Sequence, residues 1–226
     1  MEKHISVAID GPSGAGKSTL AKRAARHFGF IYVDTGAIYR TVGYAAQCAG
    51  LDSKDAEGIA ALLPGLDIRF EYDGTGTQRM FLNGRDVSEE IRTPKSSIYA
   101  SDAAAMPAVR AYLLEMQRDM AQRCDVLMDG RDIGTVVLPG AGLKVFLTAS
   151  AQARAERRCK ELREKGMDTP FDEVLRDIEY RDRQDSARPA APLRAADDAV
   201  TLDTTALDFE QSFDTLKKLI QERFGL

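Results

Sequence analysis

The chain has 226 residues, 44% of them hydrophobic, which suits one α/β domain with a full core. Its net charge of −4 and pI of about 5.4 disfavour a nucleic-acid surface, which usually carries a basic excess. No apolar run approaches the length of a membrane span, and the residues before the predicted first strand do not resemble a signal peptide. We therefore expect a soluble, cytoplasmic protein with neither nucleic acid nor membrane as a partner. The three cysteines and two histidines lack metal-ligand spacing, so we expect reduced thiols and no catalytic histidine.

The first strand is predicted over His4–Asp10 and the first helix over Thr19–Phe28. Between them lies the string G-x-x-x-x-G-K-S, whose glycines let backbone N–H groups turn toward a phosphate chain. Strand, loop and helix in this order indicate a P-loop that binds ATP, and a plain connecting turn is the disfavoured alternative. Lys17 is expected to reach the β- and γ-phosphates, and the Ser18 hydroxyl to bind Mg²⁺. The expected ATP-binding residues are Gly11, Pro12, Ser13, Gly14, Ala15, Gly16, Lys17, Ser18 and Thr19.

The middle of the chain interrupts the alternation of strands and helices. A second strand over Phe30–Val33 runs into a turn at Asp34, and a helix starts near Ala37. After a connecting segment, Leu66–Val87 alternates as a β meander and contains an Asn-Gly hairpin signal. Two helices follow, each with a proline near its start, and the second runs to about residue 123.

The last hundred residues return to alternating strands and helices. Thr169 and Pro170 predict a helix start, with Thr169 as the cap and Pro170 at the first helical position. The predicted strands cover residues 125–129, 143–148 and 199–203, and the predicted helices cover residues 151–165, 170–187 and 209–224.

These elements predict an α/β fold, a P-loop doubly wound sheet of five parallel strands with helices on both faces. We expect a core made of residues 1–62, 125–150 and 189–226, a small β-containing monophosphate-binding insertion over about 63–124, and a helical lid over about 151–188. Ligands of such sheets bind at the carboxyl ends of the strands. The P-loop, the Asp34 turn and the Asp129 turn all fall at that edge, so they should line one cleft.

Arginine outnumbers lysine by 21 to 10, which suits a phosphorylated ligand held inside a cleft of an acidic protein. A kinase of small phosphates needs no general base, because the attacking oxygen is already an anion; it needs alignment and charge neutralisation. Arg181, Asp185 and Arg188 are spaced i, i+4 and i+7 and share one helix face. An exposed ladder of ion pairs is the alternative explanation of that spacing.

Four motifs carry a family resemblance that spans nearly the whole chain in order. They are DGPSGAGKS from Asp10, DTGAIYR from Asp34, DGRDIGT from Asp129, and the stretch from Arg181 to Arg188. Together they resemble bacterial cytidylate kinases, and the β insertion resembles the enlarged monophosphate-binding domain of that family. The resemblance implies transfer of a phosphoryl group from ATP, with Mg²⁺, to CMP or dCMP.

The resemblance also implies roles for single residues. Thr35, Arg40 and Arg131 would hold the acceptor phosphate; Ser101, Arg110 and Asp132 would read the cytosine; Arg181 and Asp185 would hold the sugar; Tyr39 and Arg188 would join this substrate site. Asp129 would orient Mg²⁺ through water, with a buried capping role as the alternative. Asp132 could instead be a structural partner of Arg131 or a metal ligand. For transition-state charge we expect Lys17, Arg131, Arg181 and, among the lid arginines 154, 157, 158 and 163, first Arg157.

Three competing functions have weaker support. A kinase of UMP, AMP or a metabolite such as shikimate would not need Asp132 beside Arg131, nor the β insertion. A non-catalytic nucleotide switch that reads guanine commonly uses an N-K-x-D string, and the only asparagine here is Asn83, in a hairpin turn. An ATP-driven nucleic-acid machine is disfavoured by the acidic balance. We expect a monomer.

Overall fold

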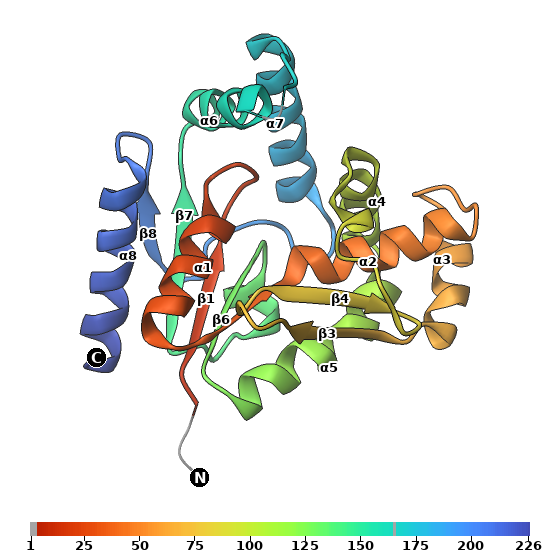
Figure 1. The fold of residues 1–226 in the computed structure, drawn as a ribbon, viewed down its shortest axis with the longest axis horizontal. Coiled ribbons are helices and arrows are strands. Elements are labelled where there is room, and N and C mark those ends of the chain that lie inside the picture. Colours follow the sequence, from red (N-terminus) through yellow and green to blue (C-terminus); the bar gives the residue numbers. More distant parts are fainter. Residues whose placement is uncertain (1–3, 165) are drawn as a thin grey trace.

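The computed structural model describes residues 4–164 and 166–226 and confirms the predicted α/β fold class. Its main sheet has five parallel strands with helices on both faces (Figure 1). The strand order is β2 (Ile31–Asp34), β6 (Val126–Gly130), β1 (Ser6–Asp10), β7 (Leu143–Thr148) and β8 (Val200–Asp203). Asp10 pairs with Gly130, and Asp129 pairs with Asp34. The carboxyl ends of β1, β2 and β6 therefore lie level at one edge.

The central strands are apolar on both sides, as a parallel sheet covered by helices requires. On one face, Val7 and Ile9 pack against α1 (Lys17–Phe28) and α8 (Phe209–Phe224). On the other face, Ala8 packs in the cluster that contains α2 (Thr35–Cys48) and α5 (Pro107–Arg123). Among the described residues, no helix has the length and apolar character that a membrane crossing demands.

The β meander forms a separate antiparallel sheet of β3 (Ile68–Tyr72), β4 (Gln78–Leu82) and β5 (Arg85–Asp86). Ile68 and Met80 are buried in the same apolar cluster as α2, so the small sheet packs against the main core (Figure 1). The helices around it are α3 (Ala56–Leu62) and α4 (Pro94–Ala104), with short 3₁₀ turns at residues 63–65 and 90–92.

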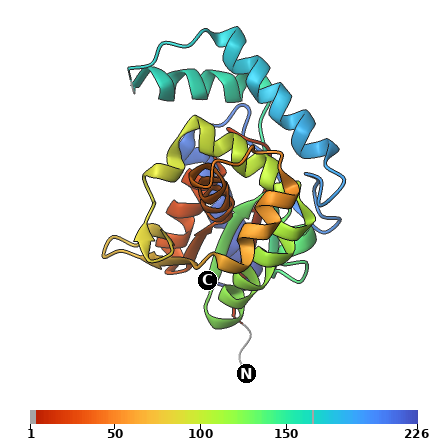
Figure 2. The ribbon, with the colours of Figure 1, turned by 90° about the vertical axis from the view of Figure 1, so that its right-hand side faces the viewer.

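A pair of helices, α6 (Ala151–Glu164) and α7 (Phe171–Ala187), lies above the carboxyl edge of the main sheet (Figures 1 and 2). The pair has its own apolar cluster, formed by Ala155, Cys159, Val174 and Ile178. The predicted end of the first helix at Lys165 lies outside the described residues.

The predicted start of α7 is wrong by one residue. Pro170 is itself the N-cap, with φ −58° and ψ 139°, the helix begins at Phe171, and the Thr169 side chain does not cap it. Pro170 has an extended ψ, and its carbonyl accepts from the N–H groups of Glu173 and Val174. The proline therefore stands just outside the helix and supplies its first acceptor.

Two further differences concern the ends of elements that meet the candidate site. Helix α1 begins at Lys17 and α2 at Thr35, each two residues before the predicted start, so their N-termini extend into the two loops. After β6 the chain forms an unpredicted turn of π-helix over Ile133–Val137. Asp10 fixes this turn by accepting from the N–H groups of Ile133 and Gly134, both at 2.7 Å.

Candidate active site

The P-loop connects the buried strand β1 to the N-terminus of α1. Gly16 is the N-cap of α1 with φ 88°, a left-handed conformation that favours glycine. A Cβ at Gly11 would lie 1.9 Å from the Leu147 carbonyl oxygen of the neighbouring strand, so only glycine fits there. The loop therefore turns tightly and aims the free N–H groups of α1, with the positive end of its dipole, at the space above it.

Lys17 folds back over this loop and is buried, with its Nζ donating to the Pro12 carbonyl at 2.7 Å. Burial, and next the Arg131 guanidinium, lower the pKa of Lys17 to about 7, against the opposing attraction of Asp129 and Asp10. The ammonium thus has fewer anionic partners than its burial demands. A polyphosphate on the loop would supply the missing negative charge.

Ser18, in the first turn of α1, contacts the carboxylate at the end of β6. The Ser18 hydroxyl donates to Asp129 Oδ2 at 2.8 Å, and the Tyr32 hydroxyl donates to Oδ1 at 2.7 Å. Burial, and next the charge of Asp34, raise the pKa of Asp129. A hydroxyl and a carboxylate beside a phosphate loop are the hard oxygen ligands that Mg²⁺ accepts.

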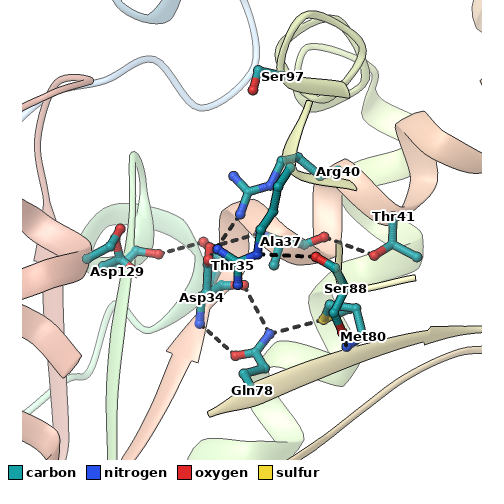
Figure 3. A network of polar contacts seen from close by, with 12 residues as sticks. Asp34, Thr35, Ala37, Arg40, Thr41, Gln78, Met80, Ser88, Ser97 and Asp129 are labelled. Carbon is teal, nitrogen blue, oxygen red and sulfur yellow. Dashed lines mark hydrogen bonds and ion pairs between the residues drawn. The ribbon is translucent and has the colours of Figure 1, made fainter. Parts of the chain in front are cut away.

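The second loop places the N-terminus of α2 against the same space. Asp34 is the N-cap: its Oδ1 accepts from the Ala37 N–H at 2.8 Å, and its Oδ2 accepts from Arg40 Nη2 at 3.0 Å (Figure 3). The Thr35 hydroxyl donates to the Asp129 carbonyl at 2.7 Å. The Nε of Arg40 is buried without a hydrogen-bond partner. A second set of free helix N–H groups and a partly unsatisfied guanidinium therefore converge on one point, as an anion site requires.

The opposite wall comes from the turn after β6 and from α7. Arg131 Nε donates to Asp185 Oδ2 at 2.6 Å. The Arg188 side chain is largely buried, and its Nη2 has no partner. Arg181 has no hydrogen bond or ion pair within residues 4–164 and 166–226, and burial lowers the pKa of both Arg181 and Arg188. Of these three guanidinium groups, Arg131 is the one that forms an ion pair among the described residues, with Asp185. Asp177 attracts Arg181, and Asp185 and Asp132 attract Arg188, but burial outweighs these charges and lowers both pKa values.

A buried ion pair closes the site between α4, α5 and the turn after β6. Arg110 of α5 donates through Nη2 to Asp132 Oδ2, and both side chains are almost fully enclosed. Sequence reasoning assigned both residues to the same ligand group but did not predict that they contact each other. Together they present one donor face and one acceptor face to the space beside Ser101.

These groups line one cavity of about 380 Å³, a size that suits small ligands. All the predicted substrate residues and the predicted metal pair are at its wall. It is lined by Thr35, Tyr39, Arg40, Ser101, Arg110, Asp129, Arg131, Asp132, Arg181, Asp185 and Arg188, and by Ser13, Gly14, Gly16, Lys17, Ser18 and Thr19 of the loop. The other three residues of the predicted loop, Gly11, Pro12 and Ala15, do not line this cavity.

Arg157, the expected lid arginine, is not at this wall. Its guanidinium donates to Thr204 Oγ1 at 3.1 Å and to the carbonyls of Thr204 and Leu207 at 2.5 and 3.4 Å, and so binds α6 to the segment after β8. A catalytic Arg157 stays a prediction that would require these bonds to break. One turn earlier, the buried Arg154 contacts the P-loop, donating to the Ser13 carbonyl at 3.0 Å.

Four residues support the site from outside it; sequence reasoning missed three of them and named the fourth, Arg154, only as one of four candidate lid arginines. Asp10 holds the π-turn, Arg154 joins the loop to α7 through Asp182, Tyr32 orients Asp129, and Gln78 contacts the main chain of Asp34. Only Asp10 carried a usable signal, because a carboxylate at the end of a buried strand needs a partner.

Comparison with known proteins identifies the family of the chain. The family model described as cytidylate kinase matches residues 7–222. The chain is 46% identical to the cytidylate kinase of Syntrophotalea carbinolica over 99% of this chain and 94% of the relative, and 44% identical to that of Bacillus cereus over 100% of both. A solved structure of an uncharacterised protein from Eubacterium ventriosum has a TM-score of 0.54 at 11% identity, covering 96% of this chain and 99% of that one, which bears on the fold alone. The chain belongs to the cytidylate kinase family.

Proposed function

We propose that this enzyme transfers the γ-phosphoryl group of ATP to CMP and dCMP, giving ADP with CDP or dCDP. The observation that carries this proposal is the meeting of two helix N-termini, those of α1 and α2, at one cavity. One suits the phosphates of a donor and the other the phosphate of an acceptor. The arginines between them suit the charge that develops during in-line transfer.

At the donor end, ATP binds to the loop of residues 11–19, with Lys17 on the β- and γ-phosphates. Ser18 and Asp129, whose oxygens lie 2.8 Å apart, would hold Mg²⁺, Asp129 through water. Among the described residues no three His, Cys, Asp or Glu side chains gather as a metal site. The small number of protein ligands, Ser18 and Asp129, suits Mg²⁺, which keeps most of its ligands as water and phosphate. When bound, the ion neutralises charge on the β- and γ-phosphates.

At the acceptor end, Thr35, Arg40 and Arg131 hold the monophosphate together with the N-terminus of α2. No general base is needed, because the attacking phosphate oxygen is already ionised at neutral pH. Arg131 and Arg181 line the same cavity and stabilise the transferring group with Lys17. The absence of an ion pair or hydrogen bond for Arg181 among the described residues supports this role, because phosphate charge would supply a partner.

Base recognition follows from the pair of Arg110 and Asp132 beside Ser101. The Asp132 carboxylate accepts from the 4-amino group of cytosine, and Arg110 donates to the ring acceptors. Uracil has a carbonyl oxygen at the same position and would meet a like partial charge. On α7, Arg181 and Asp185 bind the sugar. Tyr39 and Arg188 complete the substrate wall.

The α6–α7 pair is the proposed lid, residues 151–188, and residues 63–124 are the proposed monophosphate-binding insertion. Closure of the lid would exclude water and so limit ATP hydrolysis. Arg154 of α6 already contacts the P-loop at the Ser13 carbonyl, and it pairs with Asp182 of α7 within the lid. We further propose a cytoplasmic monomer that acts on small molecules, without nucleic-acid or membrane partners.

The test is an ADP-release assay with ATP and Mg²⁺ against CMP, dCMP, UMP, AMP, GMP and shikimate. The proposal predicts fast turnover confined to CMP and dCMP. Faster turnover of UMP than of CMP would contradict the base assignment. Silence with all six acceptors would contradict the proposed reaction.

A further inference from the structure

Strand β2 is an edge strand of the main sheet, and side chains of the small sheet contact its outer edge. The Tyr72 hydroxyl donates to the Tyr32 carbonyl at 2.7 Å. The Gln78 amide makes two contacts with Asp34: its Oε1 accepts from the main-chain N–H at 2.8 Å, and its Nε2 donates to the carbonyl at 3.3 Å. These side chains replace the neighbouring strand that β2 lacks on this side.

Tyr72 and Gln78 act as one unit, because they face each other across the β3–β4 ladder. We name this pair of side chains the β2 clamp. Gln78 is 6% exposed, and its Nε2 also lies 3.1 Å from the sulfur of Met80. Turning the amide over would set its N–H groups against the Asp34 N–H, so the surroundings select one orientation.

The residue held by the clamp is the one that organises the acceptor end of the cavity. Asp34 caps α2 through one carboxylate oxygen and binds Arg40 through the other (Figure 3). Gln78 itself is not at the wall of the main cavity. It lies on the far side of the Asp34 main chain, as Figure 3 shows, so its influence on a bound phosphate would pass through Asp34 to Arg40 and the N-terminus of α2.

We propose that Gln78 is a positioning residue for the acceptor nucleotide: through the β2 clamp it fixes Asp34, and thereby the Arg40 guanidinium that binds the acceptor phosphate. This rests on the proposed role of Arg40. Loss of the clamp would let the Asp34 turn shift, and a misplaced donor weakens a charge-assisted hydrogen bond. The P-loop shares no hydrogen bond with Gln78, so ATP binding should change little.

The test compares Gln78→Met with Arg79→Met. Methionine keeps the length and apolar volume of Gln78 and removes its hydrogen bonds to Asp34. Arg79, the next residue of β4, instead pairs with Asp86 at 2.8 Å, so its substitution controls for damage to the strand. KM for CMP and ATP, kcat, the CMP dissociation constant by calorimetry and the melting temperature are measured for both variants.

For Gln78→Met we expect KM and the dissociation constant for CMP to rise ~10-fold. This is the effect of losing one well-placed hydrogen bond, here the bond from Arg40 to the acceptor phosphate. KM for ATP should stay within about twofold of the wild type. An unchanged CMP affinity, or equal losses for CMP and ATP, would overturn the proposal. Should Gln78→Met not fold, Tyr72→Phe removes a single hydroxyl from the clamp. It should raise KM for CMP roughly threefold, and no change would overturn the proposal.

A double-mutant cycle with Arg40→Ala separates positioning from general destabilisation. If Gln78 acts through Arg40, Gln78→Met should add less than about a twofold loss of CMP affinity in the Arg40→Ala background. A full, additive loss would overturn the proposal. If Arg40→Ala alone leaves KM for CMP unchanged, the proposed acceptor site fails, and the positioning role fails with it. If Arg40→Ala weakens CMP binding and Gln78→Met does not, the proposed acceptor site is supported and only the role of the β2 clamp is contradicted.

Discussion

Replacing Asp132 by asparagine changes the one carboxylate that distinguishes cytosine from uracil in the proposed site. The side chain is 7% exposed and paired with Arg110, so water cannot easily replace a lost partner. An asparagine amide both accepts and donates, and its N–H can face the uracil 4-carbonyl oxygen. We therefore expect Asp132→Asn to improve the relative use of UMP.

The magnitude follows from the cost of a buried polar group left unpaired. That cost is ~1–3 kcal/mol, and therefore 5- to about 150-fold in the ratio of kcat/KM for CMP to that for UMP. The same substitution leaves the Arg110 guanidinium without its anionic partner, which should lower the free energy of unfolding by up to about 3 kcal/mol. The melting temperature must therefore be measured first, and the kinetics taken well below it.

The assay is ADP release at saturating ATP and Mg²⁺, with CMP and UMP each varied. Asp102→Asn is a matched control, because Asp102 lies on α4, accepts from the Ser53 hydroxyl and is not at the cavity wall. The control should keep the wild-type ratio. A folded Asp132→Asn enzyme with an unchanged ratio would contradict the role of Asp132 in base selection and move base recognition to Ser101 and Arg110.

Two other residues give further predictions. Lys17→Ala should keep the fold, and a residual rate above about a tenth of the wild type would contradict its role on the phosphates. The pKa of Lys17 is lowered to about 7, so the amine is mostly neutral at pH 8, and bound ATP should raise that pKa. Calorimetry of ATP binding in buffers of different ionisation enthalpy should therefore show an uptake of nearly one proton, which Lys17→Ala abolishes. No proton uptake by the wild type would contradict the contact between Lys17 and the phosphates. Arg154→Ala breaks the enclosed pair with Asp182 and the bond to Ser13, and should lower the free energy of unfolding by about 3 kcal/mol and raise KM for ATP. Arg158→Ala is the control: Arg158 is exposed, and its loss should lower the free energy of unfolding by less than about 1 kcal/mol. Equal melting temperatures of the Arg154→Ala and Arg158→Ala variants would contradict this role of Arg154.

The parts of the site that sequence predicts are those fixed by short-range geometry. The spacing of the P-loop motif places Lys17 and Ser18 where the loop meets the following helix, although that helix begins at Lys17 and not at the predicted Thr19. The carboxyl ends of parallel strands share one edge, so Asp34 and Asp129 had to meet there. The spacing of Arg181, Asp185 and Arg188 likewise puts them on one face of α7, and that face lines the cavity.

The parts that sequence could not predict depend on packing between distant segments. Helix α6 carries arginines on several faces, and only its rotation against the sheet decides that Arg154 meets the P-loop while Arg157 meets Thr204. Gln78 is one polar residue in an amphipathic strand, and its contact with Asp34 depends on where the small sheet docks. No local spacing contains that information.

The most direct test of the account follows the phosphorus itself. The enzyme is incubated with CMP, Mg²⁺ and ATP labelled in the γ-phosphate, and the products are separated. If the cavity transfers the phosphoryl group from ATP to CMP, the label appears in CDP, in amounts equal to the ADP formed, with little inorganic phosphate. Label that is recovered mainly as inorganic phosphate, or that stays on ATP, would contradict the claim that this cavity aligns two nucleotides for transfer.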